Sequence, residues 1–356
     1  MKIITIVGAR PQFIKAAVVS RAIKKEKSIR EIIVHTGQHF DRNMSEIFFE
    51  QMHIPKYDYN LNISNLPHGA MTGRMLETIE NVLLKENPNL VLVYGDTNST
   101  LAGVLAAKKM HIKVAHVEAG LRSYNSAMPE EINRIITDRI SDILFCPTQS
   151  AVDNLKKEGF DSMNCLINNC GDVMLDAFSY YSAYAKKPDI SVDDRFVLCT
   201  IHRMENTEYK DNLLSIVQAL ETISNEISVV LPVHPKTKAK LKEYHYNIET
   251  SNIKFIDPVS YFEMLYLLKH CETVMTDSGG LQKESYFARK KCLVLRNETE
   301  WIELVKSNGA CPVGTNADNI IAAFQSRNTV SVDFSKKLYG NGNAGSIIVE
   351  QLLQLI

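Results

Sequence analysis

The sequence has no excess of charge of one sign, because 40 lysine and arginine residues stand against 41 aspartate and glutamate residues, a formal net charge of −1. Such a chain has no overall attraction for the phosphates of a nucleic acid or for an anionic membrane surface. It also lacks any uninterrupted apolar run of the roughly 18 residues that a membrane span needs. We therefore expect no nucleic acid and no membrane as partner.

Signals for export or for a zinc site are also missing. The apolar stretch "KIITIV" is too short for the core of a signal peptide, and "GARPQ" follows it rather than a small-residue cleavage site. The seven cysteines are an odd number, mostly set in apolar runs such as "ILFC" and "FVLC". They are expected to be buried, reduced thiols of a cytoplasmic protein. Cys165 and Cys170 lack the usual spacing of zinc ligands, so no metal is expected.

What the sequence does contain is an alternation of short apolar runs with longer amphipathic stretches. One such stretch, residues 70–87, repeats Met71, Met75, Ile79 and Val82 at helical spacing and is expected to bury these side chains in the core. Strand alternating with helix predicts an α/β fold with parallel sheets covered on both faces. The expected strands are "KIITIV", "EIIVHT", "LVLVY", "KVAHV", "DILFC", "NCLIN", "RFVLCT", "ISVVLPV", "IKFID", "ETVMT" and "KCLVL".

The length of 356 residues predicts two domains at roughly 100 to 200 residues each. The alternation restarts after "AFSYYSAYAKKPDISVDDR", a polar and aromatic stretch without a strand signal. We expect an N-terminal Rossmann-like domain over residues 1–175 and a C-terminal one over residues 176–340. A closing helix over residues 341–356 should pack back across the two domains.

Polar residues that follow the strands are the first candidates for a site, because ligands bind at the carboxyl ends of strands in such sheets. "GARPQFIK" places Arg10 and Lys15 after the first strand, "YGDTNST" places Asp96 after another and "HVEAG" places Glu118 after the next. Asp96 could alternatively be the N-cap of the helix that follows it. Together these positions offer two carboxylates and two cations at one edge of the first sheet.

A helix that opens with "PEEINR" adds two further candidates. Pro129 suits its first turn, and Glu130 and Arg134 lie four apart on one helical face. Taken alone, this pair is more typical of an exposed ion pair than of a catalytic site.

The second half of the chain places cationic and small residues after its strands. "HRMEN" brings His202 and Arg203 to a strand end, and "VHP" brings His234, which we interpret as a loop or core histidine. In "TDSGGLQKES" a strand stops at Ser278 and a helix begins at once. The glycines of this turn let a ligand approach closely, and free helix amides attract an anion, so the turn can cradle phosphate. The alternative is a plain strand-to-helix turn with Ser278 as N-cap.

These stretches in combination are familiar. "GARPQFIK", "HTGQH", "YGDTNST", "HVEAGLRS", "PEEINR", "HRMEN", "VHP" and "TDSGGLQKES", in this order, closely resemble the non-hydrolysing UDP-N-acetylglucosamine 2-epimerases over nearly the whole chain. The resemblance implies the glycosyltransferase-B-type architecture, with the active site in the cleft between two Rossmann-like domains. It implies inversion of carbon 2 of a UDP-linked 2-acetamido sugar, through elimination and re-addition of UDP, without cofactor or metal.

The resemblance also implies roles for individual residues. Asp96, Glu118 and Glu130 would be the acid/base set, and His202 would lie beside the diphosphate. The other residues implied to bind the UDP-sugar are Arg10, Lys15, Arg134, Ser278, Gly279, Gly280 and Glu284, the last of these at the ribose hydroxyls.

The chain departs from the family pattern in three places. Gln12 stands where members often have glutamate, and Trp301 stands where they have an arginine that helps hold the ligand. The segment "TGQHFDRNM" differs from its form in members activated by a second substrate molecule, and that regulation is not carried over. These differences are similar to a branch that acts on UDP-2,3-diacetamido-glucuronic acid. Arg203 is the candidate cation for the carboxylate of such a sugar.

Two other functions remain open at this point. A UDP-sugar glycosyltransferase of the same fold would need an acceptor site, and it commonly needs one catalytic base rather than three carboxylates. A non-catalytic UDP-sugar sensor would bind UDP without turnover. For the epimerase, the resemblance further implies a homodimer in the cytoplasm that supplies surface polysaccharide synthesis.

Overall fold

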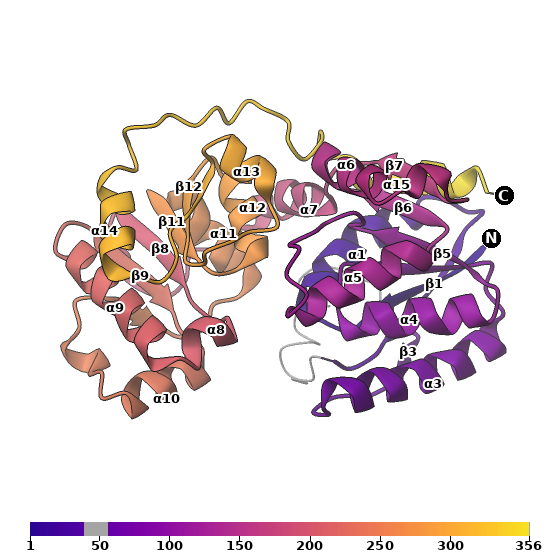
Figure 1. Cartoon of the computed structure of the whole chain (residues 1–356), viewed down its shortest axis with the longest axis horizontal. Helices are drawn as coiled ribbons and strands as arrows, with labels where there is room; N and C mark the ends of the chain where they lie inside the picture. The colour runs from indigo at the N-terminus through magenta and orange to yellow at the C-terminus, as the bar shows by residue number, and fades with distance from the viewer. Residues whose placement is uncertain (39–55, 356) are drawn as a thin grey trace. The chain divides into compact units, whose positions relative to one another are not determined.

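The computed structural model describes residues 1–38 and 56–355 (Figure 1). The chain forms two compact units: unit 1 comprises Met1–Ala177 with Leu338–Ile356, and unit 2 comprises Phe178–Lys337. Within the described residues no helix is both long enough and apolar enough to cross a bilayer.

Unit 1 is built on a parallel sheet in which β1 and β4 are central neighbours. In the described residues the strand order is β3-β2-β1-β4-β5-β6-β7. The chain winds outward from β1 in one direction and from β4 in the other, so a topological switch point lies between these two strands. The strands are β1 (Lys2–Val7), β2 (Arg30–His35), β3 (Tyr59–Asn60), β4 (Leu90–Tyr94), β5 (Lys113–Val117), β6 (Ile143–Cys146) and β7 (Leu166–Asn169).

Helices cover this sheet through apolar faces. Helices α3 and α4 pack against each other and against the central strands, and they share one core with Ile4, Ile6 and Val93 (Figure 1). The predicted core positions Met75, Ile79 and Val82 are buried there. The helices of unit 1 are α1 (Arg10–Ile23), α3 (His68–Glu86), α4 (Asn98–Lys109), α5 (Pro129–Ile140), α6 (Gln149–Lys157) and α15 (Ala344–Leu353), with a 3-10 turn at Phe160–Ser162 and with α7 (Val173–Tyr181) ending in unit 2.

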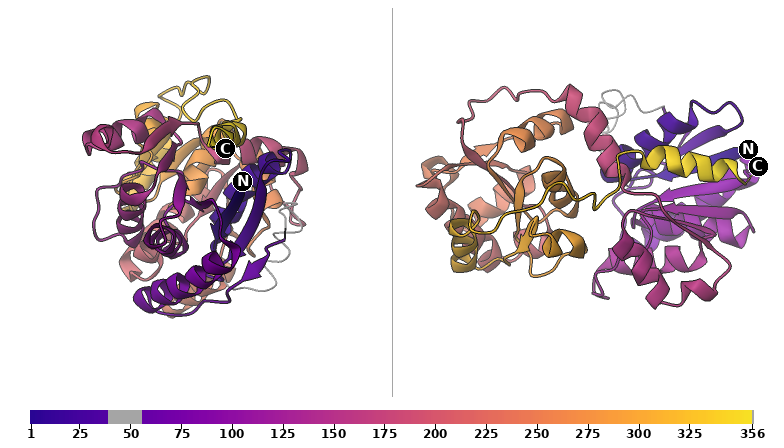
Figure 2. Two further views of the ribbon diagram at one scale, coloured as in Figure 1. Left: turned by 90° about the vertical axis from the view of Figure 1, so that its right-hand side faces the viewer. Right: turned by 90° about the horizontal axis from the view of Figure 1, so that it is seen from above.

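The C-terminal helix α15 belongs to unit 1 and packs on α1, as Figure 2 shows. Gly345 lies so close to Val18 that a Cβ there would come within 2.7 Å of its methyl group. The carboxylate of Asp176 accepts the Ala344 and Gly345 amides at 3.1 and 2.9 Å, which satisfies the N-terminus of α15. The first and last described segments of the chain therefore lie side by side.

Unit 2 repeats the architecture with a second parallel sheet. Its described strands have the order β10-β9-β8-β11-β12-β13, so its switch point lies between β8 and β11. The strands are β8 (Phe196–Thr200), β9 (Ser228–Pro232), β10 (Lys254–Ile256), β11 (Thr273–Thr276), β12 (Lys291–Val294) and β13 (Ala310–Pro312). The helices are α8 (Met204–Thr207), α9 (Lys210–Ser224), α10 (Pro235–Glu243), α11 (Tyr261–His270), α12 (Gly279–Phe287), α13 (Ile302–Lys306) and α14 (Ala317–Gln325), with 3-10 turns at Ser182–Tyr184 and Ile248–Thr250.

The α/β class and all eleven expected strands are confirmed, and two strands in the described part of the chain were not predicted. These are β3 and β13, which have two and three residues and no apolar run of their own. The expectation for the cysteines was wrong at Cys311, which is exposed, and at Cys165, which is half-buried. Cys311 lies on β13 at the edge of its sheet.

Candidate functional site

The turn after β1 begins the candidate site of unit 1. Gly8 has no space for a side chain, because a Cβ would overlap the hydroxyls of Thr36 and Ser99. Arg10 then opens α1 in an exposed position. Lys15 lies farther along α1 and is buried. The tight turn therefore brings the first turns of α1 to the switch point.

Gln12 connects this turn to the end of β4. Its side-chain oxygen accepts the amides of Gly8 and Ala9 at 2.8 and 3.0 Å. Its Nε2 donates to the Tyr94 carbonyl at 2.8 Å and to the Thr100 hydroxyl at 3.0 Å. An ionised glutamate could make the first pair of bonds but not the second, since it has no hydrogen to donate. The departure at position 12 is thus matched by its surroundings.

Glu118 follows β5 and forms an ion pair with Lys15. Both side chains are buried, so the pair holds Glu118 at the carboxyl edge of the sheet. Gly95 leaves room for this contact: a Cβ there would come 3.2 Å from Glu118 Oε2 and 3.3 Å from Lys15 Nζ. The backbone of Glu118 is in the left-handed region with φ of 74°. This conformation costs a residue with a side chain about 1 kcal/mol.

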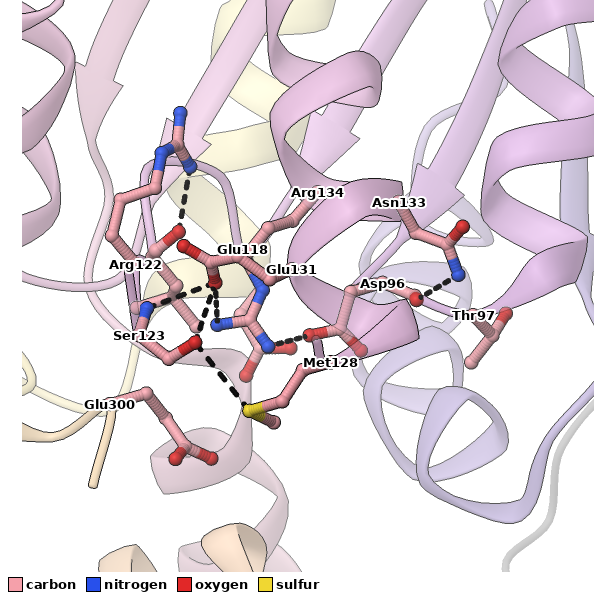
Figure 3. Close-up of polar contacts among 12 residues, drawn as sticks. Asp96, Thr97, Glu118, Arg122, Ser123, Met128, Glu131, Asn133, Arg134 and Glu300 are labelled. Atoms are coloured by element: carbon pink, nitrogen blue, oxygen red, sulfur yellow. Dashed lines mark hydrogen bonds and ion pairs between the residues drawn. The ribbon is translucent and has the colours of Figure 1, made fainter. Parts of the chain in front are cut away.

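Asp96 follows β4 and is fixed by helix α5 (Figure 3). Arg134 Nη2 donates to Asp96 Oδ2 at 2.5 Å, and Asn133 Nδ2 donates to the Asp96 carbonyl at 2.8 Å. Burial raises the pKa of Asp96; the Arg134 charge opposes this, while the Glu118 and Glu130 charges add to it. The alternative that Asp96 caps the next helix is wrong, because Thr97 is the N-cap of α4.

Glu130 and Glu131 are neighbours in α5 with different surroundings. Glu131 is buried, and it accepts the Ser123 amide and hydroxyl at 2.9 and 3.0 Å and the Tyr124 amide at 2.9 Å (Figure 3). Arg134 Nη1 lies 3.2 Å from its Oε2. Glu130 is half-buried and lies near enough to raise the pKa of Asp96. Glu131 thus fixes the Ser123–Tyr124 segment and contacts Arg134, which the sequence did not indicate.

In unit 2, Asp277 organises the switch point between β8 and β11. Its buried carboxylate accepts the His202 amide at 3.0 Å, the Arg203 amide at 2.9 Å and Asn206 Nδ2 at 3.0 Å. The side chain of His202 is 52% exposed, with Nδ1 3.8 Å from Asp277 Oδ1. His202 also lines a cavity of about 560 Å³ together with His234. His234 is the N-cap of α10, as expected of a loop histidine.

The turn at Ser278 has the geometry of an anion-binding helix start. Ser278 is the N-cap of α12, which confirms that part of the sequence prediction, and its hydroxyl accepts the Leu281 amide at 3.5 Å. Gly279 is buried, and a Cβ there would overlap the Glu300 carboxylate. Gly280 is exposed, and a Cβ there would meet no atom nearer than 3.9 Å. The open side of the turn therefore lies at Gly280.

Glu284 and Trp301 complete the described surroundings of α12. Tyr261 donates its hydroxyl to Glu284 Oε1 at 2.9 Å, which fixes that buried carboxylate. Trp301 is buried, and Lys283 Nζ lies over its ring at 4.0 Å from the centroid. A tryptophan at this position thus contacts a buried cation on α12. Such a contact is worth about 2 kcal/mol when desolvated.

The predicted site residues divide into two groups according to the unit that carries them. Unit 1 holds Lys15 with Glu118 and Arg134 with Asp96, near Glu130. Unit 2 holds its own group around the ends of β8 and β11. Residues 39–44 of the segment "TGQHFDRNM" lie outside the described residues. The residues of the two groups are Arg10, Lys15, Asp96, Glu118, Glu130 and Arg134 in unit 1, and His202, Arg203, Ser278, Gly279, Gly280 and Glu284 in unit 2.

Known proteins resemble this chain over its full length. A family model described as UDP-N-acetylglucosamine 2-epimerase matches residues 21–353. A Pseudomonas aeruginosa protein named UDP-2,3-diacetamido-2,3-dideoxy-D-glucuronate 2-epimerase is 53% identical over 100% of both chains. A Methanococcus maripaludis protein named UDP-N-acetylglucosamine 2-epimerase homolog is 47% identical over 100% of both. The crystal structure of Methanocaldococcus jannaschii UDP-GlcNAc 2-epimerase in complex with UDP-GlcNAc and UDP matches with a TM-score of 0.92 and 41% identity, over 99% of this chain and 100% of that one.

The chain has two α/β units, each with a parallel sheet and with polar groups at its switch point. This is an enzyme of the glycosyltransferase-B-type architecture, which confirms the expected fold class. The chain belongs to the UDP-N-acetylglucosamine 2-epimerase family and is an isomerase. The resemblance inferred from the motifs is thereby confirmed.

Proposed function

We propose that this protein is a non-hydrolysing 2-epimerase of a UDP-linked 2-acetamido sugar. The observation that carries the proposal is a pair of carboxylates at neighbouring strand ends of unit 1, each with its own cation: Glu118 with Lys15 and Asp96 with Arg134. Paired acid and base groups suit a reaction that removes a proton from one face of a sugar and returns one to the other. Membership of the family supports the same reaction.

The reaction is an anti elimination followed by re-addition. A base removes the proton from carbon 2 while the bond between carbon 1 and the UDP oxygen breaks, which gives a 2-acetamidoglycal and UDP. An acid then returns a proton to carbon 2 on the opposite face, and the UDP oxygen bonds carbon 1 again. Atoms and electrons balance without an oxidant, and the product is still linked to UDP.

In unit 1, Asp96, Glu118 and Glu130 supply the acid and base groups. Burial raises the pKa of Asp96, which suits a carboxyl that takes up and releases a proton during the reaction. Arg134 orients Asp96. Arg10 and Lys15, both on α1, meet the anionic groups of the substrate.

In unit 2, Ser278, Gly279 and Gly280 hold the diphosphate through the hydroxyl and the first amides of α12, where the helix dipole favours an anion. His202, when protonated, stabilises the charge on departing UDP. Glu284 accepts hydrogen bonds from the ribose hydroxyls.

Two sugars are candidates for the substrate. The 53% identical relative is named for UDP-2,3-diacetamido-2,3-dideoxy-D-glucuronate, which favours that sugar. A structure 41% identical is titled as a complex with UDP-GlcNAc, which favours the simpler one. Arg203, half-buried beside His202, is the cation offered to the carboxylate of the first sugar.

Proton NMR in deuterated water tests both substrates in parallel, with UDP-glucose, which has no 2-acetamido group, as the negative control. Deuterium entering carbon 2 of one sugar, with its manno epimer still attached to UDP, would support the proposal and identify the substrate. Release of the free sugar would contradict the non-hydrolysing course. UDP binding without exchange in either sugar would favour a transferase or a sensor.

The setting of the reaction is part of the same proposal. The seven cysteines are all unpaired thiols, which suits a reducing compartment such as the cytoplasm. We expect a homodimer whose product supplies surface polysaccharide synthesis. Analytical ultracentrifugation at several protein concentrations tests the dimer.

A further inference from the structure

A fully buried histidine lies on β5, two residues before Glu118, and contacts the residue before Asp96. His116, on β5, has no exposed surface. Its Nε2 lies 2.7 Å from the Gly95 carbonyl oxygen, and its Nδ1 lies 2.7 Å from Asp138 Oδ1. A carbonyl oxygen can only accept a hydrogen bond, so Nε2 must carry a hydrogen.

The second ring nitrogen faces a carboxylate that is held in its ionised form. Asp138 Oδ2 accepts Arg122 Nη1 at 2.6 Å and the Gly120 amide at 3.1 Å. Burial alone raises the pKa of Asp138, but the hydrogen bonds and charges of His116 and Arg122 outweigh it and set the pKa below the ordinary value. An ionised carboxylate can only accept, so Nδ1 must also carry a hydrogen.

The charges around the ring balance. Arg122 donates Nε and Nη2 to the Glu158 carboxylate at the end of α6, at 2.7 and 2.8 Å. On β6, burial and the Asp138 charge raise the pKa of Cys146 well above its ordinary value, so that thiol is neutral. A cationic His116 therefore completes a group of two cations and two anions with Arg122, Asp138 and Glu158, of which only Glu158 is exposed.

We propose that His116 is a positioning residue, with a hydrogen on both ring nitrogens, that sets the geometry of Asp96 and Glu118. Its bond to the Gly95 carbonyl fixes the peptide that leads directly into Asp96, and the Gly95 amide donates to Val117 at 2.9 Å. This role rests on the proposed function, while the protonated state rests on the two hydrogen bonds of the ring and on the ionised form of Asp138.

The same group fixes the other two elements that carry acid and base residues. The Gly120 amide, two residues after Glu118, donates to Asp138. Asp138 lies on α5 four residues after Arg134 and eight after Glu130, so it shares their side of the helix. A misplacement of about 1 Å at a reacting centre can lower turnover about a hundredfold.

The first test is ¹⁵N NMR of the full-length protein labelled at histidine. The His116 ring is assigned by its loss in a His116→Phe/Asp138→Leu double variant, in which an apolar pair replaces the buried ion pair and can preserve the fold. We expect both ring nitrogens to have shifts of protonated nitrogen with slowly exchanging hydrogens at neutral pH. A ring with one bare nitrogen would overturn the protonated state.

The second test separates positioning from folding. In the folded double variant we expect kcat to fall about a hundredfold with KM within about threefold of wild type, and the ¹³C titration midpoint of the Asp96 carboxyl to move. Exposed His111, whose φ of 59° suits asparagine, provides the matched control His111→Asn, which should change neither. A folded double variant with wild-type kcat, or with an unmoved midpoint, would overturn the role. Because the titration needs no turnover, it decides the inference even if neither sugar is a substrate.

Discussion

Lys15 and Glu118 form a buried ion pair that joins helix α1 to the end of β5, although 103 positions separate them in the chain. The pair holds a carboxylate at the switch-point edge of the first sheet, close to Asp96. Charges in such a place interact strongly because little water screens them. The arrangement leads directly to an experiment on Glu118.

Replacing Glu118 by glutamine should lower turnover about a thousandfold, because acid/base groups contribute factors of that order, while UDP affinity stays within about twofold. The change also leaves the Lys15 charge without its carboxylate, so we expect a loss of about 2 kcal/mol in the free energy of unfolding. Stopped assays, calorimetric titration with UDP and urea unfolding measure the three quantities.

The double variant Lys15→Met/Glu118→Gln is the control for that experiment. It removes the unpaired charge, so stability should recover while turnover stays low. Wild-type turnover in Glu118→Gln would contradict its place in the acid/base set.

Arg134→Gln should move the acidic limb of the kcat/KM profile to higher pH. Burial raises the pKa of Asp96 and the Arg134 charge partly opposes this, so removing that charge raises the pKa further. As the pH falls, Asp96 then takes up its proton earlier than in the wild type. Profiles from pH 5 to 9 measure the shift, and Arg139→Gln, an exposed position on the same helix, is the matched control. A limb that stays in place or moves to lower pH would rule out this coupling.

Gly280→Ala and Gly279→Ala should have opposite effects on stability. A methyl group at Gly280 enters open space and improves helix propensity, so the melting temperature should hold or rise while UDP affinity falls at least about tenfold. A methyl group at Gly279 overlaps the Glu300 carboxylate, which Arg296 holds at 3.1 Å, so stability should fall by about 1 kcal/mol. Thermal unfolding and UDP titration distinguish the two. If UDP affinity is unchanged in Gly280→Ala, the diphosphate does not bind at the first turn of α12.

Glu284→Gln should reduce the preference for UDP over 2′-deoxy-UDP. A carboxylate accepts the ribose hydroxyls more strongly than an amide does, and a hydrogen bond to a charged group contributes about 2 kcal/mol. Tyr261→Phe removes the hydroxyl that fixes this carboxylate at 2.9 Å, and it should cause a smaller loss in the same direction. Calorimetric titration gives both affinities for each variant. If the ratio of the affinities for UDP and 2′-deoxy-UDP is unaltered in Glu284→Gln, Glu284 does not bind the ribose hydroxyls.

The regular part of the fold could be predicted because each long strand has its own apolar run. Strands β3 and β13 could not, since the first is only Tyr59–Asn60 and the second is the edge segment Ala310–Pro312. Their pairing depends on neighbouring strands that are distant in sequence, and no local pattern records it.

The sequence predicted where the candidate site residues lie in the fold, but it did not predict which of them form ion pairs with each other. The switch-point rule placed Asp96 and Glu118 at strand ends, where the structure has them. Helical spacing suggested Glu130 as a partner for Arg134, whereas the guanidinium reaches Asp96 and Glu131. A helical pattern relates residues only within one helix, so contacts made across the sheet edge are invisible to it.

At Glu118 the left-handed backbone lowers stability, whereas the carboxylate at the same position is needed for the proposed activity. Glycine adopts a φ of 74° without strain, so Glu118→Gly should relieve the local backbone strain. The same change removes the carboxylate and leaves Lys15 without this ion pair. In a library of variants that carry Lys15→Met, glycine at position 118 should therefore increase in frequency under selection for thermal resistance. It should decrease in frequency under selection for turnover. Sequencing both pools would show selection keeping a strained residue for its chemistry.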